Sequence, residues 1–119
     1  MEGVFSLSSP LGQIRISHEA VAQIAGRVAA EAYGVVGMAP RGTRDRLPLR
    51  DRLRQGIAVG GDADGDVTIE LSVIVEYGLN LAEVASTLRN RVRYEVERLT
   101  GLRVAEVDVR IQDVKSSSA

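Results

Sequence analysis

Alternating apolar and polar residues predict two long strands in the second half of the chain, with one amphipathic helix between them. The first strand covers residues 67 to 77, and its inward positions are Val67, Ile69, Leu71, Val73 and Val75. Asn80 and Glu83 have the spacing of a capping box at a helix start, and Gly101 stands where the helix ends. The apolar stripe of this helix is Leu81, Ala85, Leu88, Val92, Val96 and Leu99. Residues 104 to 111 form the second strand, with inward positions Ala105, Val107, Val109 and Ile111.

The first half of the chain has the same order of strand, helix and strand. Residues 13 to 16 alternate, Ser17 is placed as a helix N-cap, and Gly34 ends a helix of residues 18 to 33. The helix has an apolar face beside a flank of small side chains that allow close packing. The face is Val21, Ile24, Val28 and Ala32, and the flank is Ala22, Ala25, Gly26 and Ala29. Residues 35 to 38 are predicted to be a short strand or an extended segment, and residues 57 to 59 to form a hairpin with residues 67 to 77.

These elements satisfy one another in an α+β fold, in which both long helices cover one face of a largely antiparallel mixed sheet of four to five strands. The other face is then polar, with Ile74 as the exception to the alternation. Its outward residues are Arg15, Thr68, Glu70, Ser72, Glu76, Asp108 and Arg110. We expect one domain over residues 12 to 114 with a basic insert at 40 to 55, a loosely ordered lead at 1 to 11, and a disordered tail at 115 to 119.

Composition restricts the function mainly by exclusion. The 119 residues are 45% hydrophobic with a net charge of -1, which gives no overall field for nucleic acid or anionic lipid. The chain has no cysteine, and its single histidine, His18, cannot build a multi-histidine metal site. No apolar run reaches the roughly 18 to 20 residues that span a bilayer, and the start lacks the basic region of a signal peptide. We therefore expect a cytoplasmic protein with no catalytic, metal-binding or cofactor-binding residues.

The strongest local charge lies between residues 41 and 54, where six arginines and two aspartates give a net charge of +4. This segment could seat an acidic protein, nucleic-acid phosphates or anionic lipid headgroups, and salt would weaken each contact. No aromatic residue lies within it to stack on bases, and an ordinary solvated loop is the competing interpretation. The candidate partner-binding residues are Arg41, Arg44, Arg46, Arg50, Arg52 and Arg54.

Four weaker motifs each have an ordinary structural explanation beside the functional one. Residues 34 to 37 match the GxxG of RNA-binding KH domains, but they also read as a helix stop followed by a strand. Asp62, Asp64 and Asp66 alternate as in a calcium loop, but Val67 and Val73 occupy the positions that require glycine and glutamate. Ser17 beside His18 is better used as a helix cap than as a nucleophile. Glu76 and Tyr77 end a strand without a second placed titratable group, and Tyr77 is expected to pack over the start of the second helix.

An ordered set of short segments points to a known family. They are LGQIRIS at 11 to 17, AG at 25 and 26 with GVVGM at 34 to 38, VEYGLN at 75 to 80, and TGL at 100 to 102 with VDV at 107 to 109 and QDV at 112 to 114. Together they resemble the alkaline-shock and Gls-type general stress proteins of Gram-positive bacteria. The resemblance implies a non-enzymatic cytoplasmic protein tied to cell-envelope stress, which associates with itself and in some members is held at the membrane by a separate anchoring protein.

Two functions from different classes follow. The first is a scaffold for the cell envelope, in which the polar sheet face or an open strand edge makes homo-oligomeric contacts and the arginines meet an acidic protein or a membrane surface. The second is a small KH-like RNA-binding module that uses residues 34 to 37 and the same arginines, although nucleic acid is the less favoured partner.

Overall fold

The computed structural model describes residues 3 to 39, 56 to 61 and 66 to 116. In chain order its elements are β1 (Val4–Ser9), β2 (Gly12–Ser17), α1 (His18–Glu31), β3 (Val35–Met38), β4 (Ile57–Gly61), β5 (Asp66–Glu76), α3 (Leu81–Thr100) and β6 (Arg103–Lys115). The arginine segment and the aspartates Asp62 and Asp64 lie outside the described residues.

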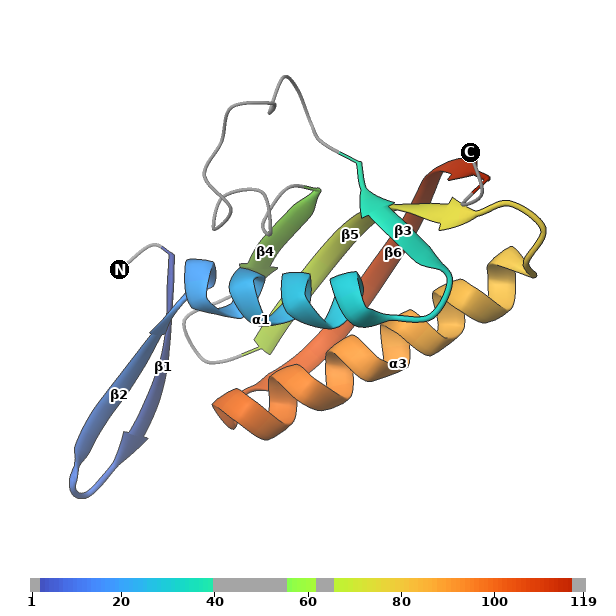
Figure 1. Cartoon of the computed structure of the whole chain (residues 1–119). Helices are drawn as coiled ribbons and strands as arrows, with labels where there is room; N and C mark the ends of the chain where they lie inside the picture. The colour runs from blue at the N-terminus through green and yellow to red at the C-terminus, as the bar shows by residue number, and fades with distance from the viewer. Residues whose placement is uncertain (1–2, 40–55, 62–65, 117–119) are drawn as a thin grey trace.

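Strand β5 is the centre of a four-stranded mixed sheet. Along one edge it pairs antiparallel with β4 over its first half and with β3 over its second half. Along the other edge it pairs in parallel with β6, and α3 makes the crossover between these two strands. Both helices lie on the same face of the sheet (Figure 1). The predicted α+β class, with two helices on one face, is therefore confirmed.

The predicted inward row of β5 is the middle of the core. Val67, Leu71, Val73 and Val75 are fully buried, and Ile69 is nearly so. In α1 the small flank is buried together with most of the apolar face, because the helix packs against both α3 and the sheet. The buried flank is Ala22, Ala25, Gly26 and Ala29.

The stripe of α3 differs from the prediction at its ends. The buried residues are Val84, Leu88, Val92 and Val96. Leu81 and Leu99 are 40% and 54% exposed, although helical spacing points both to the core side. They are exposed because they lie at the two ends of the helix, where the core does not continue. Asn80 caps the start as predicted, since its side chain accepts a hydrogen bond from the amide of Glu83 at 3.0 Å.

In β6 the predicted inward position of Ala105 is wrong. Val67 faces Val104 and Thr68 faces Glu106, so Ala105 is an extra residue in a β-bulge and is exposed. Val104 takes the buried position instead. In a second bulge Gln112 has no partner on β5, because Val73 faces Ile111 and Ile74 faces Asp113. These two bulges bound a regular stretch from 106 to 111 that keeps the predicted alternation.

Strands β1 and β2 form a separate antiparallel hairpin, which we call the arm; it projects from the start of α1 away from the main sheet (Figure 1). Residues 1 to 11 are predicted to be a loosely ordered lead; within them Phe5 is fully buried, and the centroid of its ring lies 4.4 Å from that of His18. This aromatic contact holds the base of the arm against the body. Toward the tip, Ile14 and Leu11 are 62% and 99% exposed.

Strands β3 and β4 meet beside Ser72, where the chain passes very close to β5. Ala39 donates its amide to the carbonyl of Ser72, and Ser72 donates its amide to the carbonyl of Gly56. A Cβ on Gly56 would lie 2.6 Å from the carbonyl oxygen of Ala39, and its φ is +74°. Only glycine fits this junction without strain. The predicted outward residue Ser72 is buried because the backbone of Ala39 and of Gly56 lies directly against it.

Candidate interaction surface

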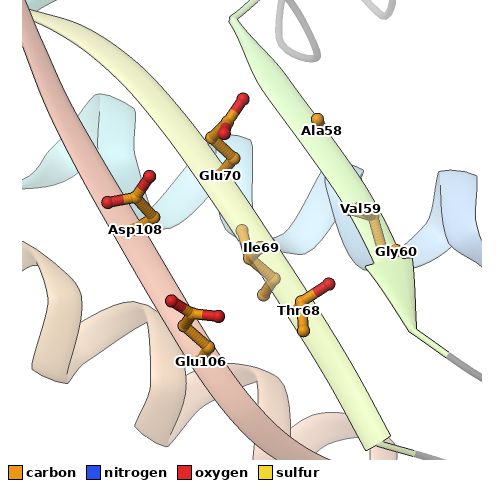
Figure 2. Close-up of a pocket in the computed structure, with 8 residues that line it drawn as sticks. All are labelled: Ala58, Val59, Gly60, Thr68, Ile69, Glu70, Glu106 and Asp108. Atoms are coloured by element: carbon orange, nitrogen blue, oxygen red, sulfur yellow. The ribbon is translucent and has the colours of Figure 1, made fainter.

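The uncovered face of the sheet has a shallow open groove of about 390 Å³. It crosses three strands, and carboxylates project into it from β5 and β6 (Figure 2). We call it the acidic groove; its lining is Ala58, Val59, Gly60, Thr68, Ile69, Glu70, Glu106 and Asp108. The carboxylates meet because the parallel register places Glu106 opposite Thr68 and Asp108 opposite Glu70.

One guanidinium balances part of this acidic charge. Arg110 contacts Glu70 at 2.8 Å across the strands and lies 3.5 Å from Asp108 along its own strand. The side chains of Arg110 and Asp108 are 54% and 52% exposed, so solvent screens both contacts. Three carboxylates against one guanidinium leave the groove acidic. Such a surface suits a basic or mixed-charge partner better than an anion.

The groove lacks the features of an active site. It is open to solvent, and its polar side chains are carboxylates and one threonine. The single histidine lies at the base of the arm against Phe5, far along the chain from these strands. Within the described residues, no group of three histidine, cysteine, aspartate or glutamate side chains could hold a metal ion. The arrangement can bind through charge and backbone, and it presents no placed nucleophile with a base.

The other sequence candidates are placed as follows. Gly34 follows the end of α1 with a φ of +87°, and residues 35 to 38 are β3, paired with β5. The GxxG is thus a helix stop that leads directly into a strand, whereas a nucleic-acid clamp leads from this loop into a second helix. The hydroxyl of Ser17 accepts a hydrogen bond from the amide of Ala20 at 3.0 Å, so Ser17 is the predicted cap. Tyr77 is 73% exposed, and its expected packing over α3 is wrong.

A second hollow, which the sequence did not predict, lies between the two helices on the opposite side of the molecule. It measures about 280 Å³, and its apolar lining is Ile24, Val28 and Leu99. Two arginines and two glutamates surround it, namely Arg27, Glu31, Arg91 and Glu95. Helical spacing points Leu99 toward the core, and its exposure marks this hollow. The hollow could be found only once the extent of the core was known.

Strand β6 has an open outer edge. Among the described residues, β6 pairs with β5 alone, and α3 packs against it from the helical face. At the start of the strand, the amide of Val104 donates to the carboxylate of Glu97 at 2.9 Å instead of to another strand. An unpaired edge presents backbone donors and acceptors to a further strand. The sequence predicted the charged residues on β6, but not that this strand would be the edge.

Comparison with known proteins identifies the family. The model of the alkaline-shock protein 23 family, which has a cell envelope-related function, matches residues 6 to 116. The chain belongs to this alkaline-shock family. This agrees with the alkaline-shock and Gls-type resemblance of the short segments. No solved structure matches the chain.

Several curated proteins are similar over most of this alkaline-shock-family chain. The uncharacterized protein YloU of Bacillus subtilis is 34% identical over 113 residues, which are 92% of this chain and 93% of YloU. The uncharacterized protein Spy1614 of Streptococcus pyogenes is 29% identical, covering 87% of this chain and 88% of its own length. A protein of Streptococcus pyogenes named stress response regulator gls24 homolog is 25% identical over 88% of this chain and 60% of its own length. The family and these names support a function related to stress and the cell envelope.

Proposed function

We propose that this alkaline-shock-family protein is a non-enzymatic cytoplasmic protein that supports the cell envelope under stress by associating with itself and with protein or membrane surfaces. The family description supplies the link to the envelope, and the gls24 homologs supply the link to stress. Among the described residues no helix is long and apolar enough to cross a bilayer. We propose that the protein contacts a membrane through its surface or through a separate anchoring protein.

The observation that carries the proposal is the open sheet. A catalytic site normally gathers convergent polar groups in a concave, partly enclosed pocket. Here the polar feature of the uncovered sheet face is a shallow open acidic groove, and beside it runs the open edge of β6. Both features favour recognition of another macromolecule.

The six arginines of residues 41 to 54 are proposed as the second contact region. Their charge is set by the sequence alone, because they lie outside the described residues. A basic segment of this kind gains about 1 kcal/mol per arginine near an anionic membrane surface, and an acidic protein would attract it by the same means. Such contacts weaken as salt rises.

Two measurements test this function. Light scattering coupled to size-exclusion chromatography, over a wide range of protein concentration, should show concentration-dependent association. Cell fractionation under envelope stress should recover part of the protein with the membrane, and replacing the six arginines by glutamine should reduce that fraction. A protein that stays monomeric at every concentration and never enters the membrane fraction would contradict the proposal.

A deletion strain gives the cellular test. Loss of the gene should sensitise cells to agents that damage the envelope, and the wild-type gene should restore growth. Unchanged growth under such agents, in a strain confirmed to express the protein before deletion, would count against an envelope function. The glutamine variant should restore growth less completely than the wild-type gene, because it removes the charge of the proposed contact region without changing a described residue.

A further inference from the structure

The central part of the β6 edge is unusually self-complementary. Between the two bulges the sequence from 106 to 111 is Glu-Val-Asp-Val-Arg-Ile, so opposite charges lie two residues apart on the outer face. On the helical face, Val109 and Ile111 are only half-buried, whereas their neighbours Leu71 and Val73 on β5 are fully buried. The edge therefore has an incompletely covered apolar row on one face and both signs of charge on the other.

Antiparallel pairing of two copies of this stretch allows only a few registers. A two-fold axis at Asp108 or at Arg110 places two copies of that same charge directly opposite each other, and an axis at Val107 places Glu106 opposite Asp108. An axis at Val109 places the Asp108 of each copy opposite the Arg110 of the other copy. This register has two opposite-charge pairs and no like-charge pair. Opposite charges in directly facing positions stabilise a strand pair, and like charges destabilise it.

The same register completes the apolar row. With the axis at Val109, each Val107 faces the Ile111 of the second copy, and the two Val109 side chains face each other. All these residues lie on the helical side of the sheet. There the β6 strand of the second copy would cover them from the open edge, as β5 already covers them from the other edge. The two bulges and the bond from Val104 to Glu97 confine the pairing to the middle of the strand.

We infer that two copies of this protein join their β6 strands antiparallel about Val109, so that the two sheets become one continuous sheet. This inference rests on the proposed self-association and names its surface and register. The assembly is isologous, because the same edge is used by both copies. The two acidic grooves then lie on the same side of the joined sheet, next to the two Asp108 and Arg110 pairs.

Charge reversal in separate chains tests the register. Asp108→Arg places arginine opposite arginine in a homodimer, and Arg110→Asp places aspartate opposite aspartate. Each variant alone should dimerise about tenfold or more weakly than the wild type. Mixed together, the two variants restore both opposite-charge pairs and should form a heterodimer close to wild-type affinity, which analytical ultracentrifugation with one labelled partner would measure.

Matched controls make the same charge changes elsewhere on the strand. Arg103→Asp and Asp113→Arg lie outside the paired stretch and should leave the dimer Kd within about twofold of the wild type, since exposed charges at that distance are screened. Circular dichroism of every variant checks that it is folded. Controls that weaken the dimer as much as the central variants, or a mixture that fails to restore it, would overturn the inferred register.

Disulfide trapping gives an independent readout, because the natural chain has no cysteine. Directly facing residues have Cα atoms about 4.5 to 5.5 Å apart, within the range that a disulfide spans. Val109→Cys should therefore cross-link with itself under mild oxidation. Val107→Cys should not, since its own copy lies about 13 Å away along the strands, but it should cross-link when mixed with Ile111→Cys.

The outcomes separate this inference from the broader proposal. Cross-linking at 109 together with heterodimer rescue supports the joined sheet. Association that persists without either result would overturn the β6 register and leave self-association standing on another surface, such as the hollow between the helices. A wild-type protein that remains monomeric would remove both the joined sheet and the self-association on which it rests.

Discussion

The body of the sheet and the β1–β2 arm use the same alternating pattern of apolar residues, but they bury it very differently. On β5 the inward residues Leu71 and Val73 are fully buried on the face that both helices cover, and strands pair with β5 along both of its edges. In the arm, Phe5 is buried at the base, whereas Ile14 near the tip is 62% exposed. Alternation therefore shows which face of a strand is apolar. Whether that face is covered depends on elements that are distant in the sequence.

The largest effect on stability is expected from the body. Leu88→Ala removes a fully buried side chain of α3, and it should lower the free energy of unfolding by about 2 to 5 kcal/mol. Leu99→Ala, on the same helix, is the matched control, and it should lower the free energy by less than about 1 kcal/mol because this side chain is largely exposed. Urea denaturation measures both. Equal losses would show that the hollow around Leu99 is filled in solution.

Most of the body could be predicted, because its elements are long and their signals agree. The capping residue Asn80, the stop at Gly101 and the alternation of β5 all have local physical causes. The position of Ala105 could not be predicted, because a bulge is set by pairing with β5 and leaves no mark in the local alternation. The acidic groove was missed for the same reason. Glu70 and Asp108 were identified as outward residues, but their meeting depends on the parallel register.

The arm should respond locally instead of globally. Phe5→Ala removes the buried ring that joins the arm to His18, and the cost of this change, about 3 kcal/mol or more, should fall on the closed state of the arm and not on the free energy of unfolding of the body. Because two strands alone are barely stable in water, the arm should open before the body unfolds. Hydrogen exchange should then become faster at the amides of β1 and β2, while the amides of α3 keep their protection.

Phe5→Leu is the control for that experiment, since it keeps an apolar side chain at the base of the arm. It should leave exchange in β1 and β2 closer to the wild-type rate than Phe5→Ala does. If α3 loses protection to the same extent as the arm, the arm and the body unfold as one unit and the contrast between them does not extend to their stability.

The joint between the two regions is expected to have an intermediate effect. Ser17 is both the last residue of β2 and the N-cap of α1, where its hydroxyl accepts a hydrogen bond from the amide of Ala20. Ser17→Ala should lower the free energy of unfolding by about 1 kcal/mol, because a free amide at the helix start loses its acceptor. Ser17→Asp restores an acceptor and should recover most of the loss. If the Ser17→Asp variant is as unstable as the Ser17→Ala variant, the hydroxyl of Ser17 stabilises the protein through packing and not through capping.

The smallest effect is expected at the outer part of the arm. Ile14→Thr keeps a β-branched side chain suited to a strand and should change the free energy of unfolding by no more than about 0.5 kcal/mol. Ile16→Thr is the matched comparison one step closer to the body, where Ile16 faces the buried Phe5, and it should cost clearly more. Thermal unfolding at low protein concentration distinguishes the two variants. If both lose the same stability, the apolar face of the arm is covered along its whole length in solution, and the burial gradient from Phe5 to Ile14 does not describe the free protein.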